Sequence, residues 1–174
     1  ILYRPNGVSI ESGWKYLTDR AEVRLGRFMA DIPRKKVRQQ FRKGDPIIIE
    51  LGYDEKNTVE FKGYITHVSA DVPIVLKCED EAYQLKKLPV NISMKNPTLQ
   101  KFLETIMPGY TIDALEGLEL GPVRFAKTTA AKVLEKLRED YSLYSYFKQG
   151  TLVCGKVYAD DSETAPVPIM LERQ

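Results

Sequence analysis

The chain has 174 residues, of which 43% are apolar and 29% are charged, a balance typical of a folded protein that excludes a disordered chain. A chain of this length buries roughly 70% of its extended surface, so it needs no metal or disulfide to stay folded. The net charge of +2 is too small to indicate nucleic-acid or membrane binding by itself. No apolar run approaches the ~18 residues that span a bilayer, and no signal peptide is visible.

Three short segments in the first half predict antiparallel strands. Apolar and polar residues alternate from Thr18 to Leu25, which is the period of a half-buried strand. Ile47 to Leu51 is a β-branched run that ends in turn residues, and Pro73 to Cys78 is a further strand. Short strands separated by turns at close spacing predict a small barrel or a sandwich.

A longer strand is expected from Thr58 to Ser69. One face of this strand should carry Val59, Phe61, Gly63, Ile65 and His67. A glycine in the middle of a strand predicts a bulge or a sharp bend, as barrels use at their corners.

After residue 95 the apolar period changes from two to 3.6, which predicts two helices near 97–107 and 129–141. Asn96 and Pro97 supply a cap and a first helical residue. The first apolar stripe is Leu99, Phe102, Leu103 and Ile106, and the second, after Thr128 or Thr129, is Ala130, Val133, Leu134, Leu137 and Tyr141. A hairpin around Gln149 and Gly150 is expected to follow.

The sequence contains few side chains that could act in catalysis. His67 is the single histidine, so a metal site would need other ligands brought in by the fold. The acidic stretch Glu79 to Glu81 could form a paired-carboxylate or cation site, but a solvated strand end explains it equally well. The sequence has no glycine-rich phosphate loop and no nucleophile elbow. We therefore expect no enzymatic activity, no cofactor and no structural metal.

Two further features leave alternatives open. Cys78 and Cys154 each lie in an apolar run and fit half-buried free thiols, although a disulfide between them is not excluded by spacing. The basic loop before Gly44 could contact DNA in a channel, or it could be a solvated connection. Its candidate contact residues are Arg34, Lys35, Lys36, Arg38, Arg42 and Lys43.

The order of these segments resembles the phage tail hub proteins, a group that includes the late control gene D family, baseplate hubs of contractile phages and the base of the VgrG spike. The resemblance is carried by an ordered set of segments, each generic when taken alone. These segments are Lys43–Tyr53, Val59–Ile65, Ile74–Asp80, Leu85–Lys87, the helix after Asn96, Thr128–Leu137 and Tyr144–Gly155.

The resemblance implies a homotrimeric hub that links tail tube and spike or tip proteins in the virion tail, assembled in the bacterial cytoplasm, with DNA passing through its lumen. The expected fold class is α+β, mainly antiparallel β: a small tube-type β-barrel over 1–88, an α+β insertion with two helices over 89–150, and return strands over 151–174 that complete a barrel or begin a second one. The chain is shorter than full hub proteins, so we expect it to be a fragment. The alternative is a non-catalytic β-barrel module that binds oligosaccharide or single-stranded nucleic acid.

Overall fold

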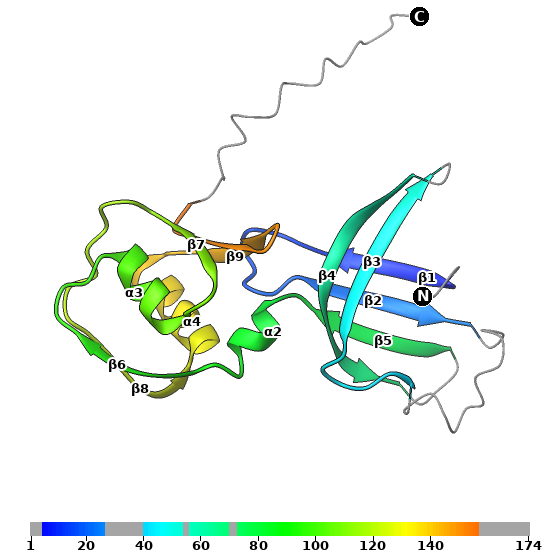
Figure 1. The fold of residues 1–174 in the computed structure, drawn as a ribbon, viewed down its shortest axis with the longest axis horizontal. Coiled ribbons are helices and arrows are strands. Elements are labelled where there is room, and N and C mark those ends of the chain that lie inside the picture. Colours follow the sequence, from blue (N-terminus) through cyan, green and yellow to red (C-terminus); the bar gives the residue numbers. More distant parts are fainter. Residues whose placement is uncertain (1–4, 27–39, 54–55, 70–72, 157–174) are drawn as a thin grey trace, which may run out of the picture.

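The computed structural model describes residues 5–26, 40–53, 56–69 and 73–156. Figure 1 shows two parts side by side along the long axis of the molecule: a curled β-sheet, and a smaller part in which helices pack with two short sheets. We call them the half-barrel and the α+β half. No helix within the described residues is both long and apolar enough to cross a membrane.

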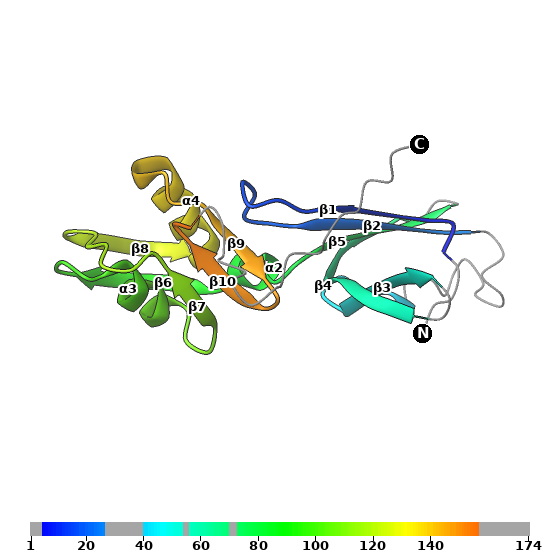
Figure 2. The ribbon, with the colours of Figure 1, turned by 90° about the horizontal axis from the view of Figure 1, so that it is seen from above.

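The half-barrel is a five-stranded sheet with the order β1-β2-β5-β4-β3, antiparallel throughout. Its strands are β1 (Gly7–Glu11), β2 (Arg20–Leu25), β3 (Pro46–Tyr53), β4 (Lys56–Val68) and β5 (Ile74–Glu79). The sheet curls so that β3 and β4 lie across from β1, β2 and β5, as Figure 2 shows. The inner face buries one apolar cluster, which comprises Ala21, Val23, Leu25, Ile49, Phe61, Ile65, Leu76 and Cys78. The predicted antiparallel, barrel-like fold is confirmed.

Two bulges in β4 change which side chains face the core at the two ends of this strand. Phe61, Gly63 and Ile65 are buried as predicted, but Val59 and His67 are exposed. The register shifts once between Ile49 and Glu50 of β3 and once between Ile65 and His67 of β4. Each shift inserts an unpaired residue, which turns the following side chains to the opposite face. The prediction was wrong at the two ends of the strand because a strict period of two ignores such insertions.

The α+β half contains three helices and two small sheets. The helices are α2 (Ala82–Leu85), α3 (Leu99–Ile106) and α4 (Ala130–Tyr141). The antiparallel pair β6 (Pro89–Met94) and β8 (Val123–Thr129) forms one sheet. The other has the order β7-β10-β9, with β7 (Thr111–Ala114) parallel to β10 (Thr151–Cys154) and β10 antiparallel to β9 (Ser145–Lys148). The two expected helices and the hairpin of β9 and β10 are confirmed.

Helix α3 begins two residues later than the sequence indicates. Its N-cap is Thr98, whose side chain accepts a hydrogen bond from the backbone N–H of Lys101. Asn96 instead has a φ of 53°, a left-handed conformation that Asn tolerates better than most residues. The buried residues of α3 match the predicted stripe, and those of α4 differ from it at two positions, because Ala131 is buried and Tyr141 is exposed.

The α+β half has its own core, built mainly from α3 and α4 with support from the strands. Its largest fully buried side chains include Phe102, Leu99, Leu103, Met107, Leu134, Leu137 and Leu152. This cluster shares no residue with the inner face of the half-barrel. Of the expected return segment 151–174, the described part pairs inside this half as β10, and residues 157–174 lie outside the described residues. The predicted domain boundaries stay a prediction.

Candidate functional site

The half-barrel has two edge strands, and both edges are candidates for assembly. Within the described residues, β1 pairs only with β2, and β3 pairs only with β4. An edge strand carries backbone N–H and C=O groups with no partner strand on one side, which proteins cover or use for pairing. These edges are therefore the places where another strand could join the sheet.

The outer face beside the β3 edge carries two exposed apolar side chains, Ile48 and Val59, next to the charged Glu50 and Lys62. Ile48 is 60% exposed and Val59 is 48% exposed. Ile48 precedes Glu50 by two residues, and Glu50 lies opposite Val59 in the register, so both apolar side chains are on the same face. We call this pair the β3–β4 patch. Its place next to an open sheet edge makes this pair a candidate contact for a neighbouring subunit.

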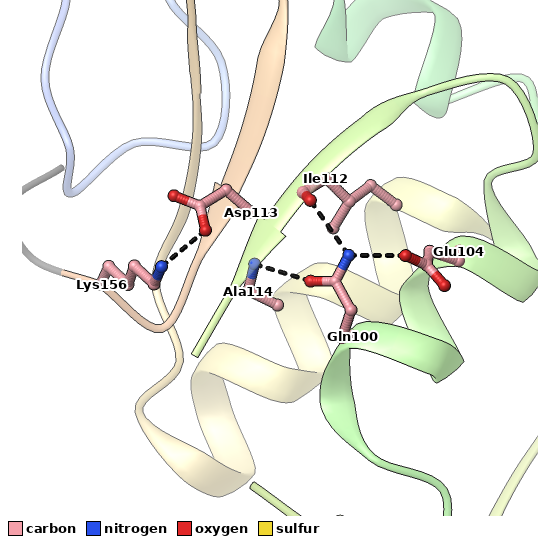
Figure 3. Close-up of polar contacts among 6 residues, drawn as sticks. All are labelled: Gln100, Glu104, Ile112, Asp113, Ala114 and Lys156. Atoms are coloured by element: carbon pink, nitrogen blue, oxygen red, sulfur yellow. Dashed lines mark hydrogen bonds and ion pairs between the residues drawn. The ribbon is translucent and has the colours of Figure 1, made fainter. Parts of the chain in front are cut away.

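In the α+β half, the edge of β7 is covered by a side chain. Strand β7 pairs with β10 on one side, and the side chain of Gln100 from α3 occupies the other side. Its Nε2 donates to the Ile112 carbonyl at 3.0 Å, and its Oε1 accepts from the Ala114 N–H at 2.9 Å (Figure 3). Nε2 also donates to Glu104 at 2.7 Å. Gln100 thus takes the place of a neighbouring strand at β7.

We predict that Gln100→Met destabilises the protein by about 1–2 kcal/mol, because two backbone groups of β7 lose their partner. The matched control is Glu104→Gln, which leaves both bonds to β7 in place and should change stability by less than about 0.5 kcal/mol. Urea unfolding followed by circular dichroism measures both. Equal stability of the two variants would contradict this role for Gln100.

The two halves meet at the loop between β1 and β2 and at the connection from β5 to α2. Figures 1 and 2 show the loop reaching the α+β half next to β9. There the ring of Trp14 meets Tyr144 edge-on, with centroids 5.3 Å apart, and Leu17 packs against the α+β core. At the connection, the ring of Tyr83 on α2 stacks on Tyr64 of β4 at 5.6 Å.

The acidic stretch Glu79 to Glu81 lies at this connection, and its members have different surroundings. Glu79 forms an ion pair with Lys86 at 2.7 Å, and Glu81 accepts a hydrogen bond from the Tyr110 hydroxyl at 3.2 Å. Asp80 is buried. The structure therefore does not gather the three acids into one site. Within the described residues, no group of three or more His, Cys, Asp or Glu side chains could hold a metal ion.

A shallow depression of about 350 Å³ lies on the outer face of β1, β2, β5 and β4. Its charged side chains follow the register, with Glu11 opposite Arg20 and Arg20 opposite Glu79, then Glu22 opposite Lys77 in the next row. Three acids and two bases thus alternate across the sheet. This mixture provides no positive groove for a phosphate backbone.

The described residues include two of the six predicted contact residues of the basic loop. Arg42 and Lys43 are exposed in the turn before β3, where the Arg42 N–H donates to the Asp45 carboxylate at 2.8 Å. Arg34, Lys35, Lys36 and Arg38 lie outside the described residues. Cys78 and Cys154 are buried free thiols in separate cores, which resolves the question of a disulfide between them.

Sequence reasoning missed the β3–β4 patch and the burial of Asp80. Ile48 stands between partly buried Ile47 and buried Ile49 in a continuous apolar run, so its residue type does not indicate that it faces solvent. Asp80 stands between two other acids, which is the usual pattern of a solvated surface. The one available signal was the strand period itself, because it assigns Ile48 to the face opposite its neighbours.

The fold is shared with three solved tail proteins, two of which come from prophages. The chain is similar to the 43 kDa tail protein of prophage MuSo2 from Shewanella oneidensis, with a TM-score of 0.61, 12% identity, and coverage of 84% of this chain and 48% of that one. It is similar to a tail protein from Neisseria meningitidis MC58, with a TM-score of 0.57, 21% identity, and coverage of 92% and 48%. It is also similar to the prophage tail protein gp18 from Listeria monocytogenes EGD-e, with a TM-score of 0.53, 12% identity, and coverage of 84% and 43%.

No family model matches the chain, and a comparison with curated proteins finds no match. The chain spans about half the length of the tail proteins that it matches. The half-barrel with its attached α+β half is therefore a fold that occurs in tail proteins, including those of prophages.

Proposed function

We propose that this chain is part of a structural component of a phage or prophage-derived tail, and that the full protein is a baseplate hub linking the tail tube to the spike or tip. The observation that carries the proposal is the fold shared with three tail proteins over 84–92% of the chain. The order of sequence segments, which resembles that of hub proteins, supports the finer assignment. In this role the protein works in the virion tail and catalyses no reaction.

The open edges support a cyclic assembly of the complete protein. The edge of β1 and the edge of β3 lie at opposite ends of one curled sheet, so β3 of one subunit can lie beside β1 of the next. Contacts between two different surfaces close into rings when the rotation allows it. The resemblance to hub proteins supplies the number three. DNA would pass through the lumen of this ring, with the basic loop that ends at Lys43 as its candidate contact.

The β3–β4 patch allows a direct test on the full-length protein. We expect the wild type to be a trimer, and Ile48→Lys combined with Val59→Lys to be a monomer, because two charges would have to be buried at the interface. The control is Leu115→Lys, a residue that is 40% exposed in the α+β half. It should leave the trimer intact.

Light scattering at micromolar concentration and above measures the mass of each variant. A monomeric wild type that no tail partner can assemble would overturn the hub proposal. A wild-type trimer that survives both lysines would keep the trimer but remove the β3–β4 patch from its interface. Unfolding curves must first show that the double variant is as stable as the wild type.

The alternative, a module that binds oligosaccharide or single-stranded nucleic acid, has less support in the structure. Such modules present exposed aromatic rings beside a positive groove. Here Trp14 packs on Tyr144, and Tyr64 packs on Tyr83, so these rings are used in contacts between the two halves. The depression on the sheet carries more acids than bases.

A further inference from the structure

The connection between β5 and α2 contains a buried acid whose hydrogen bonding is incomplete. Asp80 is only 6% exposed. Its Oδ1 accepts the backbone N–H of Ala82 at 3.1 Å, whereas Oδ2 has no hydrogen-bond partner within the described residues. An ionised carboxylate in such a position is unfavourable, because burial removes water and leaves Oδ2 without a donor.

A second acid lies beside it on the other connection between the halves. The Asp80 N–H donates to the Asp19 carbonyl at 3.1 Å, and the negative charge of Asp19 acts on Asp80. The Asp19 carboxylate accepts hydrogen bonds from the Ser12 hydroxyl at 2.7 Å and from the Gly13 N–H at 3.2 Å. Asp19 therefore holds the loop between β1 and β2 in its shape.

The electrostatic surroundings of Asp80 favour its neutral form. Burial first, and then the charge of Asp19, raise the pKa of Asp80 from 3.8 to about 7, against the opposing effects of two backbone hydrogen bonds and Lys86. The other charged groups nearby are engaged elsewhere. Lys86 pairs with Glu79, Glu81 accepts from Tyr110, and exposed Arg20 lies opposite Glu79 in the register. Burial also raises the pKa of Asp19 itself.

The two acids lie where the protonation of Asp80 can affect the contact between the two halves. Asp80 continues directly into α2, whose Leu85 is buried in the α+β core. Asp19 ends the loop that carries Trp14 to Tyr144. The contact between the two acids thus joins two segments. One is the β1–β2 loop, which packs against the α+β half, and the other is the chain that leads from β5 into α2.

We propose that the Asp19–Asp80 pair is a proton-controlled joint between the half-barrel and the α+β half. With Asp80 protonated, only one of the two acids is charged, and the loop stays closed on the α+β half. Loss of the proton places a negative charge on buried Asp80 next to the charge of half-buried Asp19. The pair then separates, and the contact between Trp14 and Tyr144 loosens while both cores stay folded.

Trp14 is the single tryptophan of the chain, so its fluorescence reports directly on this contact. Between pH 5 and pH 9, the 174-residue wild type should show one emission change with a midpoint near 7, the pKa value of Asp80. Far-ultraviolet circular dichroism should stay constant over the same range. Asp80→Asn keeps the acceptor for Ala82 and cannot ionise, so its emission should remain at the low-pH value throughout.

Three further variants make the assignment specific. Asp19→Asn should move the midpoint to lower pH, because it removes the neighbouring charge that raises the pKa of Asp80. His67→Gln removes the single histidine of the chain and should leave the midpoint unchanged. Asp140→Asn, in an exposed ion pair with Lys136, should also leave it unchanged.

The stability of the fold should change in the same sense. Because the folded-state pKa of Asp80 lies above its unfolded value, the contribution of Asp80 is complete below pH ~4, declines as the pH rises towards 7, and is constant above that. The urea midpoint of the wild type should therefore fall between pH 5 and pH 8, and that of Asp80→Asn should fall less. A wild type without a fluorescence transition, or an Asp80→Asn variant that retains it, would overturn the proposal. If Asp80→Asn does not fold, an unshifted midpoint in Asp19→Asn would overturn it equally.

Discussion

Gly63→Ala should destabilise the half-barrel by about 3 kcal/mol or more, a large effect for one added methyl group. A Cβ atom at Gly63 would fall on the carbonyl oxygen of Glu79 in β5, and 2.8 Å from the Phe61 ring. The carbonyl is part of the backbone of the neighbouring strand and cannot turn aside without breaking the pairing of β4 with β5. Strand β4 would therefore have to separate from β5 at the point where the sheet curls.

The matched control is Gly7→Ala in β1, where a Cβ atom would meet nothing within 4 Å. This variant should be as stable as the wild type or slightly more stable, because alanine restricts the unfolded chain. Urea unfolding curves of both variants, followed by circular dichroism, provide the comparison. If Gly63→Ala and Gly7→Ala have the same free energy of unfolding, the close approach of β4 and β5 at Gly63 is wrong.

The second large effect is expected in the other core. Phe102 on α3 is 0% exposed, and its ring packs against Phe125 of β8 with centroids 5.7 Å apart. Phe102→Ala should cost about 3–5 kcal/mol, since it removes a fully buried ring and leaves a cavity between α3 and the β6–β8 sheet. Leu115→Ala is the control, because Leu115 is 40% exposed, and it should cost less than about 1 kcal/mol.

Because the two cores share no buried residue, the loss of stability in Phe102→Ala should be confined to the α+β half. Amide hydrogen exchange in Phe102→Ala should accelerate in α3 and α4 more than in β2 and β5. Equal acceleration in all four elements would mean that the halves unfold as one unit. If Phe102→Ala lowers the free energy of unfolding by less than about 1 kcal/mol, the prediction that Phe102 is a major part of this core is wrong.

The elements that could be predicted from the sequence are those fixed by a local period. Strand β2 alternates strictly, and its Ala21, Val23 and Leu25 are buried as expected. Helices α3 and α4 follow from stripes at helical spacing. The hairpin of β9 and β10 follows from Gln149 and Gly150, which both adopt positive φ as a two-residue turn between strands requires. In each case neighbours in the chain contain the whole signal.

The features that were missed depend on partners far away in the chain. The mid-strand glycine of β4 predicts a bulge, but the positions of the two bulges depend on pairing with β3 on one side and β5 on the other. The parallel pairing of β7 with β10 joins residues about 40 positions apart, starting with Thr111 and Thr151. Asp80 is buried only because the β1–β2 loop and α2 come together around it. The candidate assembly edges likewise follow from the strand order, which a single sequence does not contain.

Each of the two separate cores contains one cysteine, which can serve as a chemical label for its half. Cys78 lies in the half-barrel and Cys154 in the α+β half, and these are the two cysteines of the chain. Burial raises the pKa of Cys78 to about 11 and also raises that of Cys154, so neither thiol is nucleophilic while its core is closed. Each thiol becomes reactive only when its own half opens. The rates at which a thiol reagent modifies the two positions thus measure the opening of each half separately, with no residue added to the protein.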